Sequence, residues 1–269
     1  MDAVRPGHTV QSTPEERVAR GFSANYRGNI DIEKNRAANI DPAYNCSLFL
    51  TNLPAGTNEK ILLDAITLQA PFGRVMVTSV QHPRPEEGKV NAAGKITFAT
   101  RKEAENLFQF VWNGKLVIGG MTIHVSWDRN MVAPTTHAPH VTRVLEITGR
   151  KDHVNVHWLD SFFRSKCAFH TQDVYITAEK GDERTIEWLF GSVRGQAEAA
   201  RMALEKDGKY RSVLRVRYGI DPITQHIKDR MPLQNIADTR YTPTAVTPAL
   251  AAQAGQSQYH DGRGTSSGW

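Results

Sequence analysis

Cysteine is scarce in this chain, since only Cys46 and Cys167 occur among its 269 residues. Two cysteines are too few to hold a small secreted fold together, and they favour a reducing compartment. Long apolar runs are also missing, because no stretch approaches the roughly 20 apolar residues that a membrane-spanning helix needs. Residues 1–21 contain no apolar core of the kind found in secretory signals. We therefore expect an intracellular protein, nuclear or cytoplasmic, that is neither secreted nor embedded in a membrane.

A strong excess of charge of one sign is absent as well. The net charge is only +5, and residues 1–45 and 220–269 contain equal numbers of acidic and basic residues. Residues 46–129 carry nine basic residues against seven acidic ones, and residues 143–219 carry fourteen against eleven. This small positive excess permits contact with phosphate groups, but it falls far short of a basic stripe.

The chain also lacks the residue patterns that catalysis requires. It contains no phosphate-binding glycine loop and no catalytic pair of carboxylates, and the segment GSVRG at 191–195 differs from a GxSxG nucleophile elbow. Four residues have spacings that a zinc site uses: His153, His157, Cys167 and His170. No second cysteine completes that set. We predict a non-enzymatic protein that binds no metal, no cofactor and no membrane.

What the chain does contain is an order of strands and helices that occurs twice. In residues 46–129, apolar spacing predicts strand 48–53, helix 58–69, a strand from residue 75, strand 91–98, helix 100–111 and strand 121–126. Thr100 and Glu103 match a capping box at the start of the second helix. The order βαββαβ predicts an α+β sandwich of the ferredoxin-like type, with both helices on one face of the sheet.

Residues 143–220 repeat this order without detectable sequence identity to the first copy. The predicted elements are strand 145–149, helix 154–163, strand 174–176, strand 186–190, helix 196–206 and strand 214–218. Residues 130–142 contain two prolines and predict a linker of moderate stiffness. Residues 1–45 and 221–269 show no sustained periodicity, so we expect disordered terminal segments there.

Two strands of the first copy match the signature strands of a known family. Residues 48–53 read LFLTNL and residues 91–98 read NAAGKITF. They resemble the hexamer and octamer of the RNA recognition motif (RRM), in which exposed aromatic side chains stack on RNA bases. Together with RVLEITG and EWLFGSVRGQAEAARMAL, they resemble a group of proteins with two tandem RRM-like domains that is common in filamentous fungi. Over residues 45–220 this resemblance implies two RRM folds and a role in binding single-stranded RNA.

The resemblance locates the RNA-binding residues on the open face of the first sheet. Phe49 fills the aromatic position of the hexamer, whereas the octamer carries Ala93 and Lys95 at its two stacking positions. Each base–aromatic stack contributes about 1–3 kcal/mol, so two missing stacks lower the affinity by about one to four decades. We expect Lys95 to recover part of this loss by attracting phosphate. The remaining predicted contacts lie on strands and on the charged loop: Thr51, Asn52, His124, Ser126, Arg84 and Lys89.

Several of these residues also have a purely structural interpretation. Phe49 could pack under the linker or a terminal segment, Asn52 could cap a turn, and Trp127 shares a side with Val125 and so favours the core. An open Phe49 in positive surroundings favours RNA binding. A covered Phe49 favours a protein-interaction module in which neither sheet binds nucleic acid. Single-stranded DNA is a further alternative, because no residue reports on the 2′-hydroxyl.

The open face of the second sheet is predicted to be unsuited to RNA. Alternation leaves Glu146 at the position equivalent to Phe49, and it leaves Glu187 outside while Trp188 points inward. Two carboxylates repel phosphate and offer no stacking surface. A one-residue change of register would instead expose Trp188.

Two basic residues complete the predicted second face. Arg215 and Arg217 lie on the last strand, which an RRM places beside the first strand, so we expect both to flank Glu146 in an ion-pair network. The second domain is therefore predicted to be a pseudo-RRM that acts through its helices or loops. Its expected contacts are the first domain or another protein.

Overall fold

The computed structural model describes residues 12–22, 30–31 and 40–225. All of them belong to one compact unit that spans residues 1–236. The other parts of the two predicted disordered segments lie outside the described residues. No helix among the described residues is long and apolar enough to cross a membrane. Cys46 and Cys167 are both free thiols.

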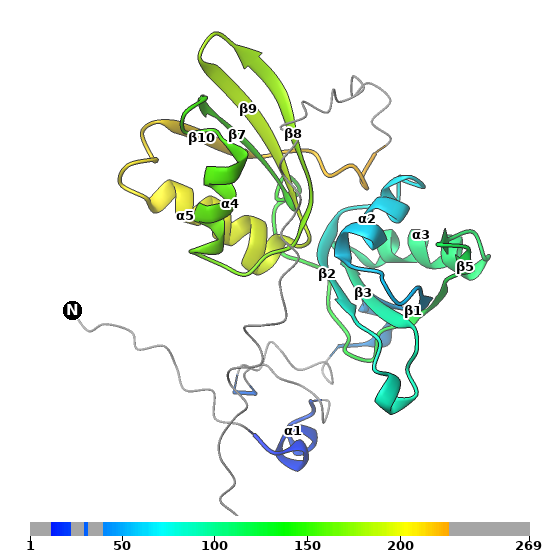
Figure 1. The fold of residues 1–269 in the computed structure, drawn as a ribbon. Coiled ribbons are helices and arrows are strands. Elements are labelled where there is room, and N and C mark those ends of the chain that lie inside the picture. The colour runs from blue at the N-terminus through cyan, green and yellow to red at the C-terminus, as the bar shows by residue number, and fades with distance from the viewer. Residues whose placement is uncertain (1–11, 23–29, 32–39, 226–269) are drawn as a thin grey trace, which may run out of the picture. The chain divides into compact units, whose positions relative to one another are not determined.

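The first half of the described chain forms a four-stranded antiparallel sheet with two helices on one face, as predicted (Figure 1). We call this the first domain. Its elements are β1 (Ser47–Leu53), α2 (Glu59–Thr67), β2 (Val75–Gln81), β3 (Ala92–Phe98), α3 (Arg101–Trp112) and β6 (His124–Trp127). The strand order β2-β3-β1-β6 places the first strand between the third and the last. That order, with a helix in each crossover, is the split βαβ topology of an RRM.

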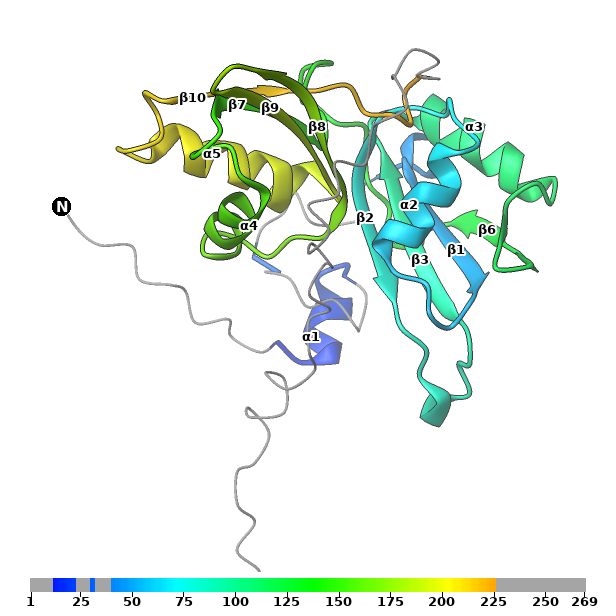
Figure 2. The same ribbon diagram turned by 45° about the horizontal axis from the view of Figure 1, so that its top comes forward.

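The second half repeats this architecture, and we call it the second domain. Its elements are β7 (Val144–Arg150), α4 (Val156–Arg164), β8 (Thr171–Lys180), β9 (Glu183–Phe190), α5 (Glu198–Lys206) and β10 (Leu214–Tyr218). The order β10-β7-β9-β8 again puts the first strand between the third and the last. Figure 2 shows α4 and α5 together on one face of this sheet. The predicted fold class, two tandem βαββαβ sandwiches, is confirmed.

Local sequence explains where the helices begin. Thr100 accepts a hydrogen bond from the Glu103 backbone N–H at 3.3 Å, and the Glu103 carboxylate accepts from the Thr100 N–H at 2.7 Å. The predicted capping box is therefore present at the start of α3. Asn58 caps α2 by accepting from the Ile61 N–H at 2.9 Å. Each helix turns its apolar side to the sheet, so the residues at helical spacing are buried in the two cores.

One predicted strand is interrupted. Of residues 121–126, Met121–Thr122 (β5) pairs with Val117–Ile118 (β4) in a separate hairpin, and only His124–Trp127 joins the main sheet. Gly119 and Gly120 both have positive φ, at 56° and 79°, and form the tight turn of that hairpin. Two consecutive glycines after a short apolar pair are the local signal for this hairpin.

The predicted terminal segments contain structure where they are described. Residues 14–19 form the short helix α1 (Pro14–Ala19), because Thr13 and Glu16 make a reciprocal capping box and Pro14 occupies the first turn. Residues 42–44 form a 3₁₀ turn, η3 (Pro42–Tyr44), just before β1. Residues 1–45 are predicted to be mostly disordered, and these two short elements lie within that segment.

The chain after β10 returns to the first domain. Ile223 is fully buried and belongs to the first hydrophobic core, and its carbonyl accepts from the N–H groups of Phe72 and Gly73 at 2.9 and 3.1 Å. Asp221 and Arg143, both fully buried, form a two-pronged ion pair at 2.9 and 2.8 Å. The disordered tail predicted from residue 221 therefore starts too early. An isolated isoleucine in a polar segment has no periodicity that would mark it as core.

The linker is tied down along one end of the first sheet. Val132 O accepts from the Cys46 N–H at 2.7 Å, and the Thr135 N–H donates to Ala99 O at 2.9 Å. Arg74 then holds the carbonyl of Val141 at 2.9 Å. Residues 130–142 thus cross the start of β1, the end of β3 and the start of β2, which lie at the same end of an antiparallel sheet.

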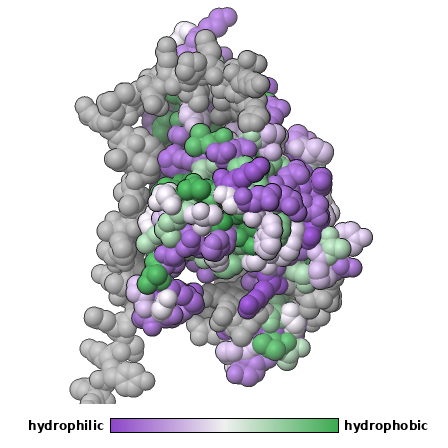
Figure 3. Space-filling model, turned by 90° about the vertical axis from the view of Figure 1, so that its right-hand side faces the viewer, coloured by the Kyte–Doolittle hydropathy of each residue, from purple (hydrophilic) through white to green (hydrophobic). Residues whose placement is uncertain are grey.

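The two domains are also joined directly. Gln172 on β8 donates to the Asp64 carboxylate on α2 at 2.8 Å, and the Thr78 N–H on the free edge of β2 donates to Ser192 Oγ at 3.0 Å. The second of these bonds satisfies a backbone N–H on an otherwise unpaired strand edge. On the face drawn in Figure 3, hydrophobic residues form small separate patches among hydrophilic ones.

Candidate nucleic-acid interface

Phe49 lies at the centre of the open face of the first sheet. In the strand register, Phe49 is opposite Lys95 on β3 and opposite Ser126 on β6, and Lys95 is opposite Ser79 on β2. These four side chains form one row across the sheet. Thr51 and His124 are paired in the neighbouring row. Five of the predicted contact residues are therefore brought together by the sheet: Phe49, Thr51, Lys95, His124 and Ser126.

Phe49 is half-buried, while His124 and Ser126 beside it are exposed. Among the described residues of this face, Phe49 is the one Phe, Tyr or Trp side chain, since the octamer positions hold Ala93 and Lys95. The face can therefore stack one base on a ring and contact its neighbours through hydroxyl and imidazole groups.

Lys95 is already paired within the protein. Its Nζ lies 2.8 Å from the Asp128 carboxylate and 3.3 Å from Asn130 O. The Asp128 side chain is only 8% exposed and also accepts from Ser47 Oγ at 3.3 Å. Sequence reasoning missed Asp128, which follows the last strand and reaches Lys95 only because β6 and β3 flank β1. The charge expected to attract phosphate is largely neutralised.

The basic loop residues are neutralised in the same way. Arg84 and Lys89 lie 2.7 and 2.5 Å from the Glu87 carboxylate, in the loop between β2 and β3. The hydrogen bond from Lys89 is the main reason why the pKa of Glu87 lies below its usual value. This partner was available in the sequence, because Glu87 stands two residues from Lys89. Within this loop Arg84 and Lys89 also pair with each other through their backbones, as an isolated antiparallel bridge.

Asn52 has both ends of its amide occupied. Its backbone has φ of 63° at the irregularity in β1, its Nδ2 donates to Thr122 O at 2.9 Å, and its Oδ1 accepts from Asn91 at 2.8 Å. Asparagine is one of the few residues that adopts this left-handed conformation readily. These contacts connect the end of β1 to β5 and to the start of β3, so they support the structural interpretation of Asn52.

Trp127 lies on the helix side of the sheet, as alternation predicted. Its ring is stacked on Phe108 at a centroid distance of 5.0 Å, and the Arg101 guanidinium covers it at 3.4 Å. Phe108 in turn stacks on Trp112 at 5.7 Å. Trp127 is therefore part of the packing between β6 and α3.

The open face of the second sheet carries charge where an RRM carries aromatics. Glu146 is opposite Glu187 on β9 and opposite Arg217 on β10, with which it forms an ion pair at 2.6 Å. Arg215 does not flank Glu146 as predicted. It is opposite Thr148, two residues further along β7, and its partner is Glu183 at 2.6 Å.

Trp188 is fully buried, which confirms the predicted register. Its ring packs against Phe163 of α4 at 5.3 Å, and its indole N–H donates to Thr171 at 3.1 Å. The aromatic that a one-residue shift would have exposed is thus held inside the second core.

The histidines and cysteine with zinc-like spacing are not gathered into a site. Within the described part of the chain, no group of three or more His, Cys, Asp or Glu side chains is placed to hold a metal ion. His153 instead lies 3.0 Å from the Asp152 carboxylate.

Comparison with solved structures finds two-domain RRM proteins. The chain is 14% identical to RNA recognition domains 1 and 2 of Sex-lethal from Drosophila melanogaster, over 65% of this chain and 100% of that one, with a TM-score of 0.25. It is 14% identical to the first two RRM domains of the yeast poly(U)-binding protein Pub1, over 65% and 99%, with a TM-score of 0.26. The RRM3 domain of Gbp2 is 22% identical over 38% of this chain and 98% of that one, with a TM-score of 0.28.

No protein-family model and no curated protein matches the chain. TM-scores below 0.5 do not identify a fold by themselves. The strand order and the helical crossovers of the two sheets carry that assignment: each is a βαββαβ sandwich with the topology of an RRM.

Proposed function

We propose that the first domain, residues 46–129, binds single-stranded RNA weakly on its open sheet, with one base stacked on Phe49. The observation that supports this most is the central row, in which Phe49 stands between Lys95 and the exposed Ser126. Hydroxyl and imidazole groups of Thr51, Ser126 and His124 are close enough to contact the same nucleotide or its neighbours.

Weak binding follows from what surrounds Phe49. A single base–aromatic stack contributes about 1–3 kcal/mol to the binding free energy. An RRM with three stacking aromatics gains about three times this stacking free energy. The nearby cations Lys95, Arg84 and Lys89 each have a carboxylate partner, so each must exchange that partner for a phosphate. In this proposal Asn52 acts mainly by holding the shape of β1, and less by contacting RNA directly.

The second domain, residues 143–220, is proposed to be a pseudo-RRM with a structural or protein-interaction role. Glu146 and Glu187 occupy the centre of its sheet, and Trp188 is buried beneath it. Its contacts with α2 and β2 support the first of these roles. We propose a binding protein, not an enzyme, with RNA as its ligand.

Fluorescence-anisotropy titration of the full chain with a random single-stranded RNA pool tests this proposal. Phe49→Ala should weaken binding by about 5- to 150-fold, because it removes one base stack. Phe49→Tyr should bind like the parent, since the ring is kept. Tyr44→Ala, which removes an exposed aromatic outside the sheet, is the matched control and should change nothing. Equal affinities for Phe49→Ala and Tyr44→Ala would contradict the proposal.

A protein-interaction module is the second candidate. The half-buried state of Phe49 and the paired cations around it favour this alternative. Absence of RNA binding at micromolar protein, at low as well as moderate salt, would favour it over the first proposal.

A further inference from the structure

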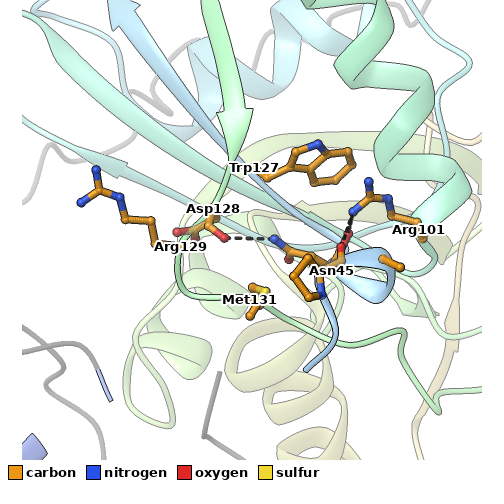
Figure 4. Close-up of a pocket in the computed structure, with 8 residues that line it drawn as sticks. Asn45, Arg101, Trp127, Asp128, Arg129 and Met131 are labelled. Atoms are coloured by element: carbon orange, nitrogen blue, oxygen red, sulfur yellow. Dashed lines mark hydrogen bonds between the residues drawn. The ribbon is translucent and has the colours of Figure 1, made fainter. Parts of the chain in front are cut away.

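A hollow of about 560 Å³ lies at one end of the first sheet, and Phe49 is not among the residues that line it. Eight residues line it, from the turn before β1, the first turn of α3, the end of β6 and the start of the linker (Figure 4). They are Pro42, Ala43, Asn45, Arg101, Trp127, Asp128, Arg129 and Met131. One lining residue, Asp128, also holds Lys95 of the candidate RNA-binding face, and none of the eight makes the contacts described between the domains.

The wall formed by Trp127 is held rigidly. Phe108 is stacked on the indole ring, with the two rings nearly parallel at 6°, and the Arg101 guanidinium covers the ring at 3.4 Å from its centroid. Arg101 is fixed in turn by Glu105 at 3.0 Å and by the carbonyl of Pro42 at 2.8 Å. Because Arg101 already covers the ring at van der Waals distance, a planar group cannot stack there without displacing Arg101.

The polar groups in the wall are already satisfied. Asn45 Nδ2 donates to Asp128 O at 3.0 Å, and Asn45 Oδ1 accepts from the N–H groups of Ser47 and Val132 at 3.0 and 3.1 Å. The Asp128 carboxylate is paired with Lys95. Recognition of a nucleobase needs free donors and acceptors for the base edge, and this wall offers none from Asn45 or Asp128. The hollow therefore presents apolar surface from Pro42, Ala43, Met131 and the edge of Trp127.

One charge at the rim has no partner. Arg129 is exposed, and no ion pair is found for it within the described residues. Figure 4 shows its guanidinium extending away from Trp127, on the side of the hollow opposite Arg101. A ligand that fills the hollow would thus meet a free positive charge at its margin, and a carboxylate is the complementary group.

We propose that this hollow is a docking site for a protein partner, and that it takes an aromatic or aliphatic side chain carried next to an acidic residue. A rigid apolar socket with one charged margin suits a side-chain anchor of a peptide. A small metabolite would require convergent free polar groups, which are lacking here. The site includes the end of β6, but the proposal does not depend on RNA binding by Phe49.

The test uses the full chain with labelled methionine methyl groups and tryptophan indoles, followed by NMR. The probes are two peptides at up to about 5 mM, Ac-DDWDD-NH₂ and Ac-KKWKK-NH₂, because a single anchor gives affinities on the order of a millimolar. The acidic peptide should shift Met131 and Trp127 in a saturable way, and the basic peptide should bind more weakly. Arg129→Glu should reduce binding of the acidic peptide by about two- to fivefold and reverse the preference, as expected for one rim charge.

Matched controls keep the result interpretable. Lys115→Glu makes the same charge change at an exposed position outside the hollow and should leave both peptides unaffected. The proposal is overturned if neither peptide shifts Met131 and Trp127, or if Lys115→Glu acts like Arg129→Glu. It is also overturned if a single-stranded RNA oligonucleotide shifts the same two signals equally in the parent and in Phe49→Ala, which would place RNA in the hollow. It is overturned as well if the signals move on dilution without peptide, which would point to a second copy of the chain.

Discussion

At the scale of single residues, the candidate RNA-binding face is defined by the partners of its cations. Lys95 is held by Asp128, and Arg84 and Lys89 are both held by Glu87. A residue count assigns these segments a positive excess, yet each of the three expected phosphate contacts has an anionic competitor within 3 Å. The strength of RNA binding therefore depends on carboxylates as much as on Phe49.

Glu87→Gln should tighten RNA binding by roughly two- to fivefold, because it frees Arg84 and Lys89 for phosphate. The salt dependence should steepen, by about 0.7 in the log–log slope for each added contact with a single strand. Anisotropy titrations at several salt concentrations measure both effects. Glu86→Gln is the matched control, since Glu86 is an exposed neighbour with the same charge and no ion pair to either cation. If both variants tighten binding equally, the gain comes from net charge and not from the released pair.

At the scale of elements, strands and helices follow local patterns, and the deviations occur where a turn imposes a special backbone. The two glycines at 119–120 divide a predicted strand, and Asn52 adopts a left-handed conformation where β1 shifts its register. Asn52 belongs to the hexamer that resembles an RRM signature, so its position suggests RNA contact. Its hydrogen bonds to Thr122 and Asn91 indicate that it shapes the end of the strand.

Asn52→Ala should lower the free energy of unfolding by about 2–3 kcal/mol, through lost hydrogen bonds and a strained backbone. Asn52→Gly should cost less, about 1–2 kcal/mol, because glycine adopts positive φ without strain. Urea denaturation followed by circular dichroism measures the difference. The folded variants should keep the affinity of the parent for RNA. A glycine variant with normal stability and weakened RNA binding would instead assign Asn52 to the RNA contact.

At the scale of the whole molecule, the two sandwiches share structural elements. The linker is bonded along the end of the first sheet, β8 contacts α2, and the chain after β10 places Ile223 in the core of the first domain. The buried pair of Arg143 and Asp221 fixes the segment that carries Ile223. If the segment moved away, the charge of Arg143 would be left buried without its partner, which is strongly unfavourable. The ion pair therefore holds the segment in place.

Ile223→Ala should lower the free energy of unfolding by about 2–5 kcal/mol, as for a fully buried aliphatic side chain. Ile220→Ala, three residues earlier at a position 53% exposed, should change it by no more than about 0.5 kcal/mol. Urea denaturation followed by tryptophan fluorescence compares the two. Equal, small effects would mean that the segment after β10 does not contribute to the first core in solution.

Interactions between near neighbours in the chain were sufficient to predict much of this protein. The periods of 2 and 3.6, the capping box of Thr100 and Glu103, and the inward side of Trp188 each depend on residues a few positions apart. The βαββαβ order follows from them, whereas the central place of Phe49 on the open face was implied by the resemblance to the RRM and depends on the strand order β2-β3-β1-β6. The pairing of Arg84 and Lys89 with Glu87 could also have been predicted, because these residues lie a few positions apart in the chain. Counting charges alone does not assign such partners.

Other features were decided only when distant segments met in space. Asp128 reaches Lys95 because β1 brings β3 and β6 within one strand spacing on either side. Arg215 pairs with Glu183 because the cross-strand register, set by the whole sheet, places it opposite Thr148, two residues from Glu146. Ile223 becomes core, and the hollow beside Trp127 forms, from segments more than 80 residues apart. A pattern along the chain carries no information about such distances, because they depend on how the finished elements pack.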